Sequence, residues 1–208
     1  IHRDISAALD NPRGRELLKG SMGILQLNAL EIEELLQNPK LSELKSSSYD
    51  HYEILSTCFA RLSEIDPENA IRLTASIDSK LQDRAMKTIF KEWGTSDPDA
   101  ASAASLEIEN PLYKKTALVQ TINAIAKTDP ERAFALALEH DDSRSPLSEA
   151  FSSILMKIAA TDPLLAIEKS GEIPLKGIRS KGAQNARERG IMSEWSKNDP
   201  DAALAYIL

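Results

Sequence analysis

The sequence predicts an all-α protein built from a repeated helical hairpin. The pair Asp-Pro occurs five times, at intervals of 31, 32, 33 and 37 residues, and these pairs use half of the ten prolines. Alanine stands four residues after each of these aspartates. A fixed period of about 20 to 50 residues is typical of repeat proteins, and long alternating runs of β-branched residues, which would predict strands, are absent. The pairs are Asp66-Pro67, Asp97-Pro98, Asp129-Pro130, Asp162-Pro163 and Asp199-Pro200.

Residues 1–48 precede the first hairpin and depart from the repeat. Their apolar residues are spaced for two or three short helices, so we expect an N-terminal helical cap. A terminal repeat with an altered outer face keeps the end of a helical stack soluble. The apolar residues are Ile5, Leu9, Leu17, Leu18, Ile24, Leu25, Leu30, Ile32, Leu35 and Leu36.

Each hairpin begins with a longer first helix that ends at the Asp-Pro pair. Large apolar residues stand four and seven positions before every aspartate, and such three- and four-residue steps mark one face of a helix. Trp93 and Trp195 occupy the position four before the aspartate, where Leu62 stands in the first copy. This equivalence favours a core role for both tryptophans over an interface role. The first helices are expected near residues 50–64, 81–95, 113–127, 146–160 and 183–197.

The Asp-Pro pair predicts the start of the shorter second helix. An aspartate side chain accepts hydrogen bonds from the free N–H groups of a helix's first turn, which stabilises the helix by about 1 kcal/mol. Proline fits the first helical position because its missing N–H would have no partner there. Its ring also disfavours helical geometry at the preceding residue. The alanine four residues on allows neighbouring helices to approach closely.

The repeats imply one continuous domain over residues 49–208. A single hairpin cannot bury its apolar face alone, so about five hairpins are expected to stack into an α-solenoid with a concave and a convex surface. The pattern leaves open whether this solenoid is right- or left-wound.

Residues that could perform chemistry are sparse. The three histidines, His2, His51 and His140, are too scattered for a metal site built from a short motif. Cys58 lies between Leu55 and Leu62 on the apolar face, which favours a buried thiol over a reactive one. We therefore expect no metal, no cofactor and no enzymatic activity. The alternative is an enzyme or a small-ligand-binding domain with polar residues converging from several repeats.

Charge gives a candidate binding segment. The chain has a net charge of -7, but the stretch from Lys169 to Lys197 has seven basic and three acidic residues. It also holds five glycines and prolines and lies in the longest interval between Asp-Pro pairs, so it predicts a protruding loop. A solvated connection is one interpretation, and a site for an acidic protein segment or phosphate group is the other. The candidate partner-binding residues are Lys176, Arg179, Lys181, Arg187 and Arg189.

Composition argues against two classes of partner. The acidic remainder of the chain would repel a phosphate backbone, so nucleic acid is not expected. No apolar stretch approaches the roughly 18 residues of a membrane span. The chain opens without methionine, and trimming of targeting segments from either end is left open.

Two segments carry a specific resemblance. Residues 93–101 read W-G-T-S-D-P-D-A-A, and residues 195–203 read W-S-K-N-D-P-D-A-A. The chain from about residue 50 to 208 resembles a group of uncharacterised bacterial α-helical repeat proteins with W-x-x-x-D-P-x-A-A units. Members often have an opening Y-x-x-L-x-x-x-F segment, here residues 52–59. Members commonly begin with an export signal or membrane anchor, so the resemblance implies a location in the bacterial envelope or outside the cytoplasm if such a segment was trimmed here; it implies no activity. The unit length also resembles tetratricopeptide repeats, a likeness of shape only.

These observations favour a non-catalytic scaffold that binds another protein or a peptide through its concave surface. Self-association through the last helix, Asp199 to Leu208, is a further expectation, because end-to-end stacking would bury it.

Overall fold

The computed structural model describes residues 5–20, 23–44, 49–141, 147–174 and 180–208. These residues form helices joined by short connections, and they contain no strand. The prediction of an all-α protein is therefore confirmed.

The chain forms two compact units, Ile1–Thr121 and Ile122–Leu208. The predicted cap and the first two hairpins belong to the first unit. The third hairpin straddles the boundary, since its first helix reaches residue 125, and the last two hairpins lie in the second unit. The stacking of all five hairpins into one domain stays a prediction.

The predicted cap contains more helices than the expected two or three. Asparagine is the reason, because Asn11, Asn28 and Asn38 each accept a backbone N–H bond at the start of a helix. Two of them are followed by proline, so these helices start as the second helices of the repeats do, with asparagine in place of aspartate. The helices are α1 (Ile5–Leu9), α2 (Pro12–Lys19), α3 (Ala29–Leu36) and α4 (Pro39–Glu43), with the 3-10 turn η1 (Ile24–Gln26).

Each repeat has the expected pair of helices. All five aspartates accept a hydrogen bond from the backbone N–H three residues on, at 2.9–3.1 Å, as the N-cap prediction requires. The first helices are α5 (Tyr49–Ile65), α7 (Ser79–Ser96), α9 (Pro111–Ile125), α11 (Ser148–Ala159) and α13 (Ser180–Asn198). The second helices are α6 (Pro67–Leu73), α8 (Pro98–Glu107), α10 (Pro130–His140), α12 (Pro163–Glu172) and α14 (Pro200–Ile207), and a 3-10 turn, η2 (Thr74–Ser76), follows α6.

The repeated apolar positions form the core. The alanine four residues after each aspartate is buried in every copy, and so is the large residue four before it. Trp93 and Trp195 are therefore core residues. Small alanines in the second helices leave room for the aromatic and branched side chains of the first helices. The buried alanines are Ala70, Ala101, Ala133, Ala166 and Ala203.

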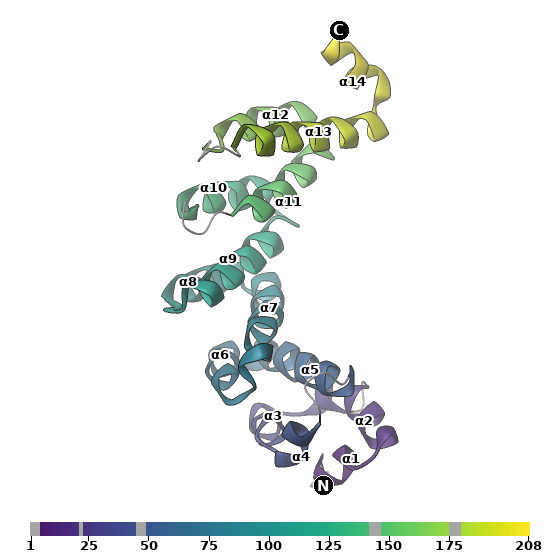
Figure 1. The fold of residues 1–208 in the computed structure, drawn as a ribbon, viewed down its shortest axis with the longest axis vertical. Helices are drawn as coiled ribbons and strands as arrows, with labels where there is room; N and C mark the ends of the chain where they lie inside the picture. The colour runs from purple at the N-terminus through teal and green to yellow at the C-terminus, as the bar shows by residue number, and fades with distance from the viewer. Residues whose placement is uncertain (1–4, 21–22, 45–48, 142–146, 175–179) are drawn as a thin grey trace. The chain divides into compact units, whose positions relative to one another are not determined.

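Within each unit, packing follows chain order (Figure 1). In the first unit α5 packs on α7 and α6, and it also contacts α2 and α3. In the second unit α11 contacts α10, α12 and α13, and α13 contacts α12 and α14. Phe134 and Phe151 meet edge to face with ring centroids 5.6 Å apart, which joins α10 to α11. Within each unit, neighbouring hairpins thus pack against each other.

Candidate functional site

The predicted basic site is spread over more than one surface. Lys176 and Arg179 lie outside the described residues. Lys181, Arg187 and Arg189 lie on α13. Arg187 and Arg189 are two residues apart, which places them on nearly opposite sides of a helix with 3.6 residues per turn. Arg187 lines a groove of about 280 Å³ against α11, and Arg189 lines one of about 980 Å³ against α14.

Arg187 is partly covered by its own groove. Ser152 and Met156 of α11 form the facing wall, and Arg187 Nε is buried without a protein hydrogen-bond partner. Burial lowers the pKa of the guanidinium, and the nearby Glu188 carboxylate raises it. Since an arginine pKa lies far above neutrality, the side chain keeps its charge.

The groove between α13 and α14 has an apolar side. Leu204 and Ile207 line it and are exposed, Ile207 by 68%. At the position of Ile207, eight residues after the aspartate, the other copies have a small buried residue: Thr74, Ser105, Ala137 or Ser170. The last helix therefore differs from the other second helices in both the size and the exposure of the side chain at this position.

A third groove, of about 570 Å³, runs along α5 and α7 in the first unit. Tyr52, Ser56 and Ala60 line it from α5 at steps of four residues, so they share one helix face. Gln120 of α9 also borders it. The facing wall is a basic stripe on α7 with steps of four, three and four residues: Lys80, Arg84, Lys87 and Lys91.

The four cations of the basic stripe differ in their partners. Lys87 pairs with Asp83 at 2.9 Å, and Lys91 pairs with Glu92 at 2.8 Å. Arg84 lies over the ring of Tyr52, with its guanidinium carbon 3.0 Å from the ring centroid. Among the described residues, neither Lys80 nor Arg84 has an acidic partner within ion-pair distance. The groove thus has two neutralised cations and two that remain available.

Asp83 is the acid nearest the centre of the stripe. Partial burial raises the pKa of its carboxyl, but hydrogen bonds from Lys87 and from the Thr116 hydroxyl, the latter at 2.6 Å, outweigh this and lower the pKa. The contacts with Lys87 and Thr116 therefore favour the ionised form of Asp83 and fix its position.

This stripe is not apparent from the net charge of long segments, because residues 51–168 are acidic overall. The helical spacing of the four basic residues was a signal that could have shown it. The contact between Arg84 and Tyr52 could not be predicted from the sequence, because it depends on how α5 and α7 pack.

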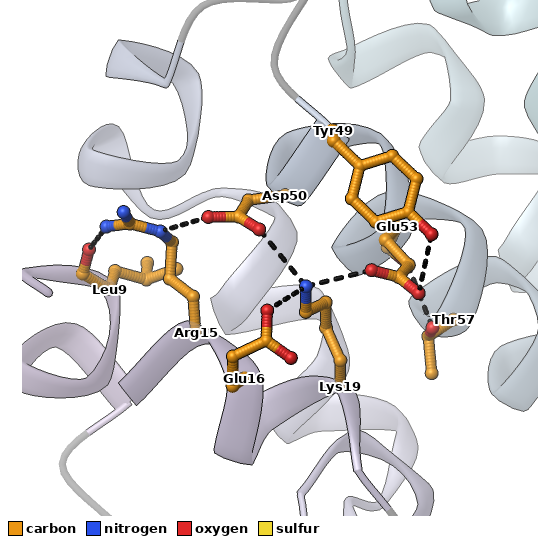
Figure 2. A network of polar contacts seen from close by, with 8 residues as sticks. All are labelled: Leu9, Arg15, Glu16, Lys19, Tyr49, Asp50, Glu53 and Thr57. Carbon is orange, nitrogen blue, oxygen red and sulfur yellow. Dashed lines mark hydrogen bonds and ion pairs between the residues drawn. The ribbon is translucent and has the colours of Figure 1, made fainter. Parts of the chain in front are cut away.

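A separate polar network joins α2 to the start of α5 (Figure 2). Lys19 Nζ lies 2.7 Å from Glu16, 3.1 Å from Asp50 and 2.8 Å from Glu53. Arg15 Nε pairs with Asp50 at 2.8 Å, and Arg15 Nη1 donates a hydrogen bond to the Leu9 carbonyl. The hydrogen bonds that the Lys19 ammonium group donates to Glu16 and Glu53 raise its pKa. Every charge drawn in the figure has an opposite partner, so the network is a structural junction between cap and repeat.

Cys58 and His51 are among the described residues whose side chains could perform chemistry. Cys58 is fully buried, and burial raises the pKa of its thiol, which excludes the reactive-thiol alternative. His51 is buried, with Nδ1 2.9 Å from the Leu44 carbonyl. The described residues hold no cluster of three or more histidine, cysteine or acidic side chains able to bind a metal ion. Within the same residues, each helix is too short or too polar to span a membrane.

Comparison with known proteins found no match to a family model, to a curated protein or to a solved structure.

Proposed function

We propose that the protein is a non-catalytic scaffold that binds another protein or a peptide. The observation that carries this proposal is the groove along α5 and α7, which combines an aromatic platform, small side chains and available cations on rigid helices. Long polar side chains around an aromatic contact are common features of protein interfaces.

The composition of this groove also argues against the enzymatic alternative. A general base works best with a pKa near the operating pH. In the groove, the carboxyl of Asp83 has a lowered pKa and pairs with Lys87, while Glu92 pairs with Lys91. Both carboxylates therefore take part in ion pairs, which does not suit the role of a general base.

Photo-crosslinking from inside the groove tests the scaffold proposal. With a photoreactive amino acid at Thr88, which lines the groove, we expect one discrete crosslinked protein in the source cell. A matched probe at the exposed Leu112 of α9 should give no such product, and a probe at the exposed Lys181 of α13 examines the predicted basic segment. The proposal fails if neither Thr88 nor Lys181 crosslinks a protein beyond the Leu112 background.

We also propose that the five hairpins stack into one α-solenoid. The supporting observation is the packing of first helices on their sequence neighbours inside each unit, α5 on α6 and α7 in the first and α11 on α10, α12 and α13 in the second. A compact domain of 208 residues has a radius of gyration of about 17 Å. Small-angle X-ray scattering should give a clearly larger value for an extended stack, whereas a value near ~17 Å would contradict the solenoid.

Self-association is a second candidate role, favoured by the exposed Leu204 and Ile207. In the same scattering series, the apparent mass should rise with protein concentration. The rise should disappear when both residues are replaced by serine. A mass that is constant with concentration would exclude this role.

A further inference from the structure

The basic stripe of α7 has a chemical character that differs from the rest of the chain. The protein as a whole carries a net charge of -7, yet four basic and two acidic side chains line this one groove. The stripe spans twelve residues of helix, and its ends lie about 16 Å apart along the axis. Such a local reversal of charge favours a partner of the opposite sign.

We infer that the groove between α5 and α7 binds an acidic segment of a partner protein, with the partner's carboxylates on Arg84 and Lys80. This inference rests on the proposed scaffold function and names the partner's chemistry at the same groove.

Arg84 is the centre of the proposed contact. Its guanidinium carbon lies over the Tyr52 ring, and this cation–π contact restrains the side chain. Guanidinium groups bind carboxylates through two parallel hydrogen bonds. Because the orientation is already set by Tyr52, less side-chain freedom is lost on binding.

Lys80 supplies a second contact one helical turn away. Four residues of helix separate Lys80 from Arg84, a rise of about 6 Å. Carboxylates two residues apart on an extended chain, or four apart on a helix, match this distance. Ser56 and Ala60 of α5 border the groove with small side chains, so a peptide backbone has room to lie beside the stripe.

The remaining charges direct the partner toward this end of the stripe. Asp83 is neutralised by Lys87 and accepts the Thr116 hydroxyl, and Glu92 is paired with Lys91. These pairs contribute little net charge, so the available positive charge lies on Lys80 and Arg84. Nucleic acid fits less well, because a strand extending past so short a stripe would meet an acidic surface.

A binding assay with defined probes tests the inference. The probe is a fluorescein-labelled oligoglutamate of about eight residues, long enough to cover the stripe as an extended chain. Fluorescence anisotropy at low salt should show saturable binding that weakens as salt is added. Oligoglutamine of equal length should not bind, and an oligothymidylate should bind more weakly than oligoglutamate.

Two double variants with the same change in net charge locate the site. The pair Lys80→Glu with Arg84→Glu should raise the Kd for oligoglutamate at least about tenfold. The pair Lys181→Glu with Arg189→Glu, on α13, should leave it within about twofold. Tyr52→Leu keeps the charge but removes the platform for Arg84, so we expect a smaller loss, of about threefold. Lys80 and Arg84 are exposed, and circular dichroism checks that each variant is folded.

Other outcomes overturn the inference in distinguishable ways. Equal losses in both double variants would show general charge attraction, and tighter binding of oligothymidylate would favour nucleic acid over an acidic protein. Absence of oligoglutamate binding would refute the acidic partner, while a product crosslinked from Thr88 would still support the scaffold. If neither experiment gives a signal, both proposals fail.

Discussion

Replacing Leu62 by alanine should lower the free energy of unfolding by about 2–5 kcal/mol. Leu62 is fully buried in the last turn of α5, at the position that tryptophan occupies in two other copies. Removing its branched end leaves a cavity that the surrounding helices fill only partly, and the lost contacts add to the lost burial. Urea denaturation followed by circular dichroism measures the change.

Leu112→Ala is the matched control, because it makes the same chemical change at a side chain that is 61% exposed in the same unit. Its expected effect is within about 0.5 kcal/mol. Similar losses at both positions would contradict the assignment of the repeated apolar position to the core.

Replacing Lys19 by methionine should lower the free energy of unfolding by about 1–3 kcal/mol, between the values typical of exposed and buried ion pairs. Methionine retains most of the aliphatic stem, so the loss reports the charge. The Lys19 side chain is only 8% exposed, and its removal leaves Glu16 and Glu53 without this cation and Asp50 with Arg15 alone. Lys40→Met is the control: its pair with Asp10 is well exposed and should contribute less than about 1 kcal/mol.

The dependence of this loss on pH follows from the same network. Hydrogen bonds from Arg15 and Lys19 lower the pKa of Asp50, so its contribution to stability is present above the ordinary aspartate pKa of about 4 and is lost as pH falls below it. The pKa of Lys19 is raised, so its contribution persists up to the ordinary lysine pKa of about 10. The difference between Lys19→Met and the parent protein should be constant between about pH 5 and 9 and shrink below about pH 4. A difference that grows in acid would contradict the assigned network.

Much of the fold could be predicted from the sequence because short local motifs specify where its helices begin. The Asp-Pro pair specifies a cap and a first helical residue within two positions, and all five predicted caps formed. The N-terminal helical cap, residues 1–48, was harder to predict. Asn11, Asn28 and Asn38 start helices there, but no sequence repeat indicates them. A local N-cap starts the helix in both regions, but only the repeated Asp-Pro caps were recognised from the sequence.

The candidate site was harder to predict because its contacts connect distant parts of the chain. Arg84 and Tyr52 are 32 residues apart, and Lys19 and Asp50 are 31 apart. Only the packing of α5 against α7 and α2 brings these pairs together. Glycines, prolines and net positive charge directed the prediction to α13 instead, where Arg187 and Arg189 line different grooves.

The placement of the two tryptophans gives the molecule a spectroscopic property. Trp93 lies in the first compact unit and Trp195 in the second, and both indole rings are almost entirely shielded from water. Phenylalanine in place of either one leaves a single intrinsic fluorophore confined to one unit. The emission of such a chain reports the unfolding of the unit that holds the tryptophan, so a pair of single-tryptophan proteins tells whether the two units unfold together or separately.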